Sequence, residues 1–128
     1  MSSPLTPEQV GRVVSMAHDL ARAGRTAELT ELIAHGLPVD VADAEGNTAL
    51  MLAAYRGHPE TVAALLRLGA DPDRLNDRGQ APLAGALFKG EDEVCRALLA
   101  AGARTDVGTP TAREAARLFG REQLLDQP

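Results

Sequence analysis

Glycine recurs along this chain with a period of 33 residues, and this period constrains the fold more than any other feature. The glycines that share the interval are Gly24, Gly57 and Gly90; Gly36, Gly69 and Gly102; and Gly46 and Gly79. A fixed period of about 20–50 residues is typical of repeat arrays, in which each unit packs only on its neighbours. The chain is therefore predicted to be a stack of similar units.

Each period contains two segments with helical spacing of apolar residues. These segments run from Thr48 to Tyr55 and from Pro59 to Leu68, with Gly57 between them. Glycine accepts the positive φ that ends a helix, so each unit is predicted to be two short antiparallel helices. Such short helices are stable only when neighbours cover their apolar sides. We expect an all-α solenoid of helix-turn-helix units, joined by short β-turn or hairpin connections such as the polar stretch 74–79.

The second period resembles the ankyrin repeat family. Residues 46–58, Gly-Asn-Thr-Ala-Leu-Met-Leu-Ala-Ala-Tyr-Arg-Gly-His, are similar to the family pattern G-x-T-P-L-H-x-A-A-x-x-G-H, and residues 69–71 are similar to its G-A-D. The next period keeps Gly79, Pro82-Leu83, Ala86, Gly90, Glu93, Leu98-Leu99 and Gly102-Ala103. The resemblance implies an ankyrin-repeat solenoid whose inner helices and turns form one concave face.

The repeat register divides the chain into about four units within one domain, 1–128. We expect an N-terminal capping repeat at 7–42, repeats at 43–75 and 76–108, and a partial C-terminal capping repeat at 109–128. Terminal units of such arrays are degenerate because one side meets water. Ser15-Met16-Ala17-His18 stands at the T-P-L-H position of the first unit. The last turn has lost three residues, so the final hairpin should be short. The resemblance thus implies a small stand-alone ankyrin repeat protein.

Some family positions are altered. Met51, Ala84 and Glu114 occupy the place of the family's His, and Ala81 replaces its Thr in the third unit. By the resemblance, the Thr and His side chains connect units by hydrogen bonds. A lost Thr cap costs about 1 kcal/mol, so this array should be less stable than one of ideal repeats.

Composition excludes several function classes. The net charge of −5 argues against nucleic acid as a partner. No apolar run approaches the length of a membrane span or of a signal-peptide core, and Cys95, the single cysteine, cannot form an intramolecular disulfide. We therefore expect a cytoplasmic protein with no membrane contact.

Chemistry-bearing side chains do not converge in the repeat register. Cys95, His18, His35 and His58 fall at different structural places in their units. Cys95 stands where the second unit has Val62, which predicts a buried structural thiol rather than a nucleophile. We expect no catalytic residues, no metal and no cofactor. An enzyme or metal protein whose site this register misplaces stays open as the less favoured alternative.

The few aromatic residues point to a binding surface. Just before each mid-repeat glycine stand the pairs Arg22-Ala23, Tyr55-Arg56, Phe88-Lys89 and Leu118-Phe119, which contain all three aromatic residues of the protein. In the family this place resembles the concave surface, which binds partners together with the hairpin tips. The alternative is that each aromatic side chain merely packs on its neighbour. The expected contact residues in the tips are Glu45, Asn47, Leu75, Asp77, Arg78 and Gln80.

These observations predict a non-catalytic protein-protein interaction module. Aromatic and arginine side chains often dominate interface energies, and Arg22, Arg56 and Lys89 favour a partner with an extended acidic segment. An immunity or antitoxin-like inhibitor of a partner enzyme is the alternative function. The chain is expected to be a monomer or a weak homodimer, the latter through Ala100, Ala101 and Leu118 at the last units.

Overall fold

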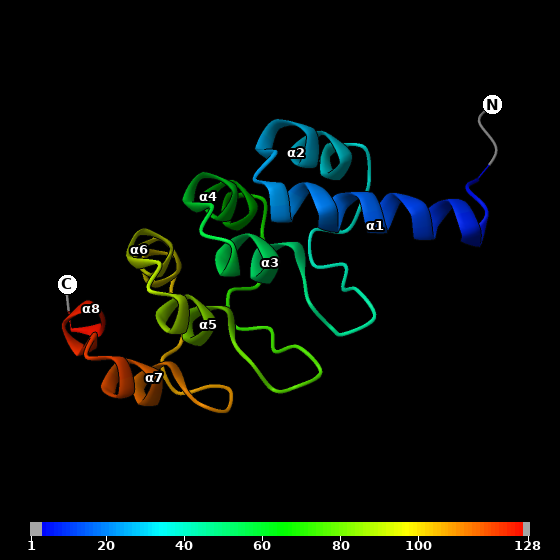
Figure 1. Ribbon diagram of the computed structural model, residues 1–128. Helices are drawn as coiled ribbons and strands as arrows, with labels where there is room; N and C mark the ends of the chain where they lie inside the picture. The colour runs from blue at the N-terminus through cyan, green and yellow to red at the C-terminus, as the bar shows by residue number, and fades with distance from the viewer. Residues whose placement is uncertain (1–3, 127–128) are drawn as a thin grey trace.

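The computed structural model describes residues 4–126, which form eight helices and no strand (Figure 1). The helices are α1 (Pro7–Ala23), α2 (Thr26–Ala34), α3 (Ala49–Tyr55), α4 (Pro59–Arg67), α5 (Pro82–Lys89), α6 (Asp92–Ala100), α7 (Ala112–Phe119) and α8 (Glu122–Leu125). None of these helices is long and apolar enough to cross a bilayer.

The helices form two layers that run along the stack (Figure 1). The inner helices α1, α3, α5 and α7 pack in succession, and the outer helices α2, α4, α6 and α8 do the same beside them. Within each unit the inner and outer helices also contact each other. The prediction of an all-α stack of helix-turn-helix units is therefore confirmed.

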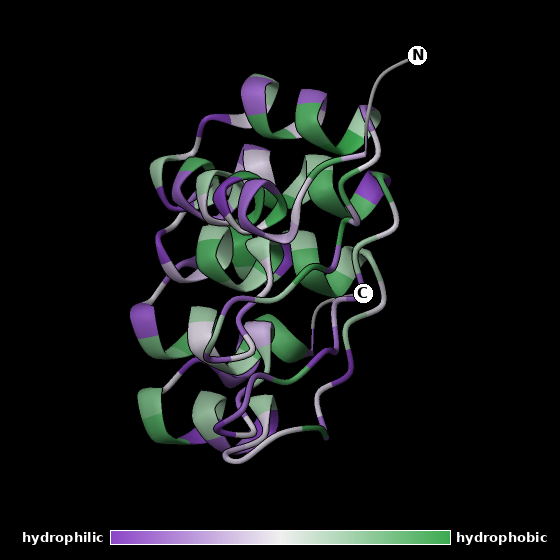
Figure 2. Ribbon diagram, turned by 90° about the vertical axis from the view of Figure 1, so that its right-hand side faces the viewer, coloured by the Kyte–Doolittle hydropathy of each residue, from purple (hydrophilic) through white to green (hydrophobic). Residues whose placement is uncertain are grey.

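The core between the layers is built mainly from alanine and leucine. It is one continuous cluster that extends from Ala17 in α1 to Leu124 in α8. Most of the strongly hydrophobic ribbon segments in Figure 2 lie in the helices. Small side chains allow helices to approach closely, so a chain with few aromatic residues can still bury its helices.

The three buried polar side chains of the described core are each hydrogen-bonded. The Nε2 atom of His18 lies 2.9 Å from the Val41 carbonyl oxygen, to which it donates. The hydroxyl oxygens of Thr26 and Thr61 lie 2.7 Å apart and connect outer helices α2 and α4. The third, Thr48, caps α3, so burial leaves none of these groups without a partner.

The first helix is longer than the repeat pattern predicts. Ser15 aligns with the helix-capping Thr48, yet it lies in the middle of α1, which begins at Pro7. Thr6 caps this helix through a reciprocal pair of hydrogen bonds with Gln9, which is a capping box. The proline and the capping box start the helix before the repeat position is reached, and its first turns project beyond the stack (Figure 1).

Neighbouring units approach each other closely at the mid-repeat glycines. Gly24 has a φ of 70°, and a Cβ atom there would lie 2.6 Å from Nδ1 of His58 in the next unit. The Nε2–H group of His58 donates to the Arg22 carbonyl oxygen at 2.7 Å, which holds the ring in this place. At Gly57 a Cβ atom would lie 2.5 Å from the Glu91 carboxylate, and at Gly90 it would lie 3.1 Å from the end of the Arg121 side chain. A neighbouring side chain thus fills the space of a Cβ atom at Gly24 and Gly57 and narrows it at Gly90.

Hairpin tips of successive units are also hydrogen-bonded to each other. The main-chain N–H of Asp77 donates to the Glu45 carbonyl oxygen at 3.0 Å, and that of Thr109 donates to the Gly79 carbonyl oxygen at 2.9 Å. The first tip is closed by an isolated antiparallel bridge between Ala42 and Thr48. The predicted short hairpin connections are therefore present, and main-chain hydrogen bonds join them along one edge of the stack.

Capping differs among the inner helices as the sequence predicts. The Thr48 hydroxyl accepts a hydrogen bond from the Met51 N–H at 3.3 Å, and Thr111 forms a capping box with Glu114. Ala81, at the start of α5, has the same extended backbone conformation but provides no side-chain cap. The third unit therefore lacks one stabilising interaction that the second has.

Replacing Ala81 with threonine should stabilise the protein. The new hydroxyl would accept a hydrogen bond from the Ala84 N–H, so the free energy of unfolding should rise by about 1 kcal/mol in urea denaturation. Ala81→Val is the matched control, because valine has the shape of threonine without the acceptor. Equal stabilities of the two variants would show that the cap contributes nothing.

Replacing Gly24 with alanine should destabilise the protein more than replacing Gly79. Both glycines have a φ near 70°, at 70° and 73°, but a Cβ at Gly79 would meet no atom within 4 Å. Each alanine costs about 1–2 kcal/mol of backbone strain. Gly24→Ala also displaces His58 from its hydrogen bond, which should lower the free energy of unfolding by a further ~1–3 kcal/mol. Urea denaturation measures both losses, and equal losses would contradict the role of the close approach.

Candidate functional site

The predicted pairs lie at the ends of the inner helices and repeat in register. Arg22, Tyr55, Phe88 and Leu118 occupy the first position of the pair, and Ala23, Arg56, Lys89 and Phe119 occupy the second. In the last three units the structure brings the first position of one unit beside the second position of the next. The aromatic contacts on this surface are therefore shared between two units.

Two such contacts involve aromatic rings. The Lys89 ammonium lies 5.2 Å from the centre of the Tyr55 ring, within cation–π range. Phe88 and Phe119 have ring centres 5.4 Å apart and meet edge to face. The aromatic side chains therefore do pack on neighbours, but Tyr55 remains 39% exposed and Phe88 59% exposed. Packing and availability for a partner are thus compatible at these residues.

A hollow of about 360 Å³ lies over α5 and α7, and we name it the apolar groove. None of its lining residues is charged. Tyr55, Phe88 and Phe119 provide aromatic walls, while Ala84 and Ala115 are small and buried. The lining residues are Tyr55, Gln80, Ala84, Gly85, Phe88, Thr109, Pro110, Ala115, Leu118 and Phe119.

A second hollow of about 260 Å³ lies over α3 between two hairpin tips, and we name it the polar groove. Tyr55 and Gln80 line both hollows, so the two are adjacent. The lining residues are Arg22, Glu45, Asn47, Met51, Leu52, Tyr55, Arg56, Asn76, Arg78 and Gln80. The two grooves together with Lys89 form what we call the groove face.

The basic residues of the groove face differ in how their charges are balanced. Arg22 forms ion pairs with Asp19 at 2.9 Å and Asp43 at 3.6 Å. The Asp43 carboxylate also accepts hydrogen bonds from the main-chain N–H groups of Glu45 and Asn47. Burial alone would raise the pKa of Asp43, but these hydrogen bonds outweigh it and the pKa lies below its ordinary value. Arg22 therefore meets a firmly ionised partner.

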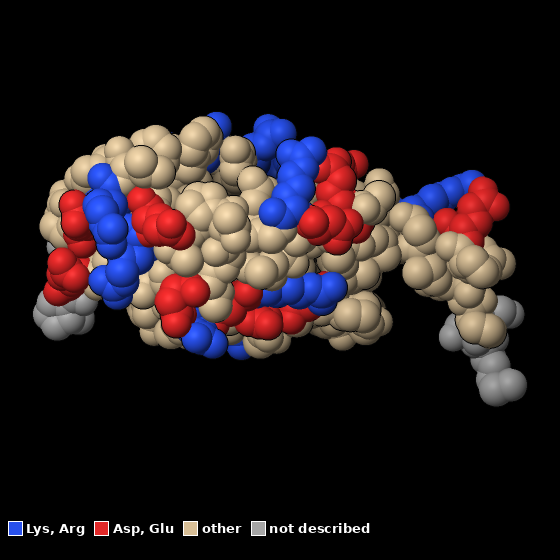
Figure 3. Space-filling view, turned by 90° about the horizontal axis from the view of Figure 1, so that it is seen from below, with Lys and Arg blue, Asp and Glu red and all other residues tan. Residues whose placement is uncertain are grey.

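Arg56 and Lys89 are not balanced in this way. Within residues 4–126, no carboxylate lies within 4.0 Å of either side chain's nitrogen atoms. Arg78 is 3.9 Å from Glu45. Seen from the side of the inner helices and tips, the surface has an uncharged central area flanked by charged side chains (Figure 3). The uncompensated positive charge of the groove face thus resides at Arg56 and Lys89.

Two of the predicted tip residues do not line either groove. Asp77 contacts the preceding tip, with its side chain against Gly46 and its N–H bound to Glu45. Leu75 is 40% exposed but lies outside both sets of lining residues. Glu45, Asn47, Arg78 and Gln80 do line the polar groove. Only some residues of the tips therefore line the polar groove.

Sequence reasoning missed the small residues that make the apolar groove hollow. Leu52, Gly85 and Ala115 occupy the same register position in successive units. The change from leucine to glycine and alanine opens the space over α5 and α7. A comparison of side-chain volume at each register position would have shown this, whereas a search for aromatic and charged residues could not.

The cysteine and the three histidines are each held by their own surroundings. Cys95 is fully buried in α6, as expected from its alignment with Val62. His18 and His58 are held by carbonyl oxygens, and the Nδ1 atom of His35 lies 2.8 Å from the Glu31 carbonyl oxygen. Among the residues that the structure describes, no three His, Cys, Asp or Glu side chains are grouped so that they could hold a metal ion.

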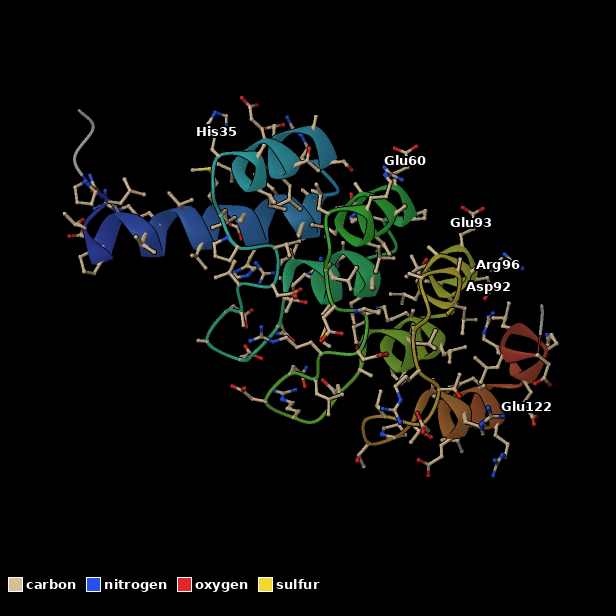
Figure 4. The ribbon with its side chains drawn as sticks, turned by 180° about the vertical axis from the view of Figure 1, so that it is seen from behind. His35, Glu60, Asp92, Glu93, Arg96 and Glu122 are labelled. Atoms are coloured by element: carbon tan, nitrogen blue, oxygen red, sulfur yellow. The ribbon has the colours of Figure 1, made fainter. Side chains whose placement is uncertain are left out.

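The opposite side of the molecule has a different character. Figure 4 shows that Glu60, Glu93, Arg96 and Glu122 extend outward from the outer helices. Asp92 is ion-paired with Arg121, which joins α6 to the last unit. This side presents charged side chains and lacks the aromatic residues of the groove face, so it provides positions for control substitutions.

Comparison with known families agrees with this architecture. Residues 17–109 match the family described as "Ankyrin repeats (3 copies)". The chain belongs to the ankyrin repeat family. Ankyrin repeats are in general protein-protein interaction modules, and the family is typically non-enzymatic.

Several proteins share segments of this ankyrin array. The chain is 52% identical over 58 residues to oxysterol-binding protein-related protein 1 of Rattus norvegicus, which is 44% of this chain and 6% of that protein. It is 50% identical over 52 residues to ankyrin repeat domain-containing protein 29 of Danio rerio, covering 40% and 17%. An ankyrin repeat protein of Pseudomonas aeruginosa is 43% identical over 49 residues, covering 38% and 29%. The match thus covers only a small part of each relative's length.

The buried thiol of Cys95 should make stability sensitive to alkaline pH. Burial, with a contribution from Asp92, raises the pKa of Cys95 from its ordinary value of 9.0 to about 11. The folded state therefore favours the neutral thiol, and this contribution is present below pH 9.0 and lost as pH rises towards 11. Relative to Cys95→Val, wild-type stability should fall by up to about 1.4 kcal/mol per pH unit in this range. Urea denaturation of both proteins at several pH values measures the difference, and parallel pH profiles would contradict it.

Proposed function

We propose that this ankyrin repeat protein is a non-catalytic binding module that holds a partner protein on its groove face. The observation that carries the proposal is the exposed aromatic surface of Tyr55, Phe88 and Phe119 beside the uncompensated charges of Arg56 and Lys89. Aromatic and arginine side chains combine large contact area with hydrogen bonding, which is why they often dominate binding energies.

The geometry of the contacts supports this assignment. The Tyr55 and Phe88 side chains are each packed on one side, by Lys89 and Phe119 respectively, and exposed elsewhere. A side chain that is already ordered loses little conformational entropy when a partner covers it. The main-chain hydrogen bonds between tips also hold the edge of the polar groove in place. The groove face is therefore preorganised for binding.

The test is the capture of partner proteins from cells that naturally express this chain. The full chain is immobilised as the wild type and as the triple variant Tyr55→Ala, Arg56→Ala, Phe88→Ala. A partner retained by the wild type should bind the variant at least about tenfold more weakly, because the central contacts are removed. Far-ultraviolet circular dichroism should show the same helix content in both proteins.

The matched control is Glu60→Ala with Glu93→Ala on the outer helices. These side chains point away from the groove face (Figure 4), so this variant should retain the partner with unchanged affinity. Equal binding to the wild type and the triple variant, or loss of binding in the outer-helix control alone, would contradict the proposal.

A further inference from the structure

We infer that the groove face recognises an extended segment that carries a bulky apolar side chain and, nearby, a carboxylate. The apolar side chain would enter the apolar groove, and the carboxylate would pair with Arg56 in the neighbouring polar groove. This inference rests on the proposed function and specifies the chemistry of the partner. It follows from three observations: the depth of the apolar groove, the position of the uncompensated charge, and the contiguity of the two grooves.

The apolar groove suits a large uncharged side chain. Its volume of about 360 Å³ lies within the range of roughly 300–1,000 Å³ that is typical of ligand pockets. Its small floor residues, Ala84 and Ala115, are buried beneath the aromatic walls of Phe88 and Phe119. A charged group placed there would lose hydration without finding an ionic partner, whereas an aromatic or leucine side chain would gain contact area.

Gly85 gives the groove its depth. It lies in the middle of α5 and does not have a positive φ, so its backbone does not require glycine. A Cβ atom at Gly85 would only meet the edge of the Tyr55 ring, at 3.4 Å and 3.7 Å, which is ordinary van der Waals contact. Glycine inside a helix is destabilising relative to alanine. Gly85 therefore makes α5 less stable than alanine would, and in return it leaves open the space over the helix.

The second unit shows the effect of filling the same position. Leu52, which stands in register with Gly85, is half-buried and forms part of the floor of the polar groove. The hollow beside Leu52 is smaller, at about 260 Å³, and has charged and amide side chains around it. Small residues in the third and fourth units, Gly85 and Ala115, therefore line the apolar groove, whereas Leu52 of the second unit lines the polar groove.

The uncompensated positive charge of Arg56 favours a carboxylate in the polar groove. Arg56 is exposed and, within residues 4–126, lacks a carboxylate within 4.0 Å, while Arg22 is already paired with Asp19 and Asp43. A guanidinium binds a carboxylate through two parallel hydrogen bonds, which adds geometric specificity. Lys89, which lies over the Tyr55 ring, adds positive charge where the two grooves meet. Because Tyr55 lines both grooves, one continuous segment can cover them.

The experiment uses a phage-displayed library of random short peptides, selected on the intact protein. Enriched peptides should share an aromatic or large aliphatic residue and an Asp or Glu close to it in sequence. One enriched peptide is then synthesised, with matched forms in which the apolar residue is alanine or the acidic residue is its amide. Affinities are measured by fluorescence anisotropy at low and high salt, and binding should weaken as salt screens the ion pair.

Two protein variants test which groove binds the apolar residue of the peptide and which binds its acidic residue. Gly85→Leu makes the third unit like the second, so it should weaken the parent peptide at least about tenfold and affect the alanine form little. Arg56→Gln should weaken the parent peptide several-fold and affect the amide form little. Gly85→Ala is a milder variant that secures folding. It should raise the melting temperature while weakening binding. A glycine that has no role in the groove would give the first effect without the second.

The inference and the proposed function fail in different ways. Enriched peptides that lack either feature, or that bind Gly85→Leu and Arg56→Gln as tightly as the wild type, overturn the inference. If such peptides still lose affinity in the triple variant of Tyr55, Arg56 and Phe88, the groove face remains the binding surface and only its chemistry is different. A library that yields no selective peptide also overturns the inference, while the capture of folded partners decides the proposed function.

Discussion

The close approach of successive units at the mid-repeat glycines is the constraint on which the rest of this structure depends. At Gly24 the ring of His58 occupies the space that a Cβ atom would need, and the equivalent glycines are covered by Glu91 and Arg121. These glycines directly follow the residue pairs at the ends of the inner helices, so the same close approach accompanies the contacts of Tyr55 with Lys89 and of Phe88 with Phe119.

Small side chains at repeated register positions account for both the close-packed core and the hollow in the surface. Alanine fills many of the buried positions, as at Ala53 and Ala86, and lets the two helix layers approach closely. Where small residues occur at register positions that face the tips, as at Gly85 and Ala115, they leave a groove instead of a packed contact. The large aromatic side chains are consequently placed at the surface, around the hollow.

The period of the glycines allowed the helices, their order and the buried place of Cys95 to be predicted from sequence. The groove could be predicted only in part. Aromatic and basic residues mark its walls in the sequence, but its depth depends on what Gly85 lacks. The ion pair of Arg22 with Asp19 follows from their spacing on one helix. Its pairing with Asp43 could not be predicted, because Asp43 reaches it from a loop whose path is set by main-chain hydrogen bonds. The early start of α1 was readable in principle, since Thr6 and Gln9 form a capping box.

The sharing of each surface contact between two units has a consequence for how recognition can change. Tyr55 meets Lys89, and Phe88 meets Phe119, so the surface proposed for binding is built from junctions between units and not from single units. Transplanting the third unit into another array would carry Phe88 and Lys89 but leave both without their native neighbours. An internal unit takes part in two junctions and a terminal unit in one, so exchanging the third unit changes both of these contacts at once.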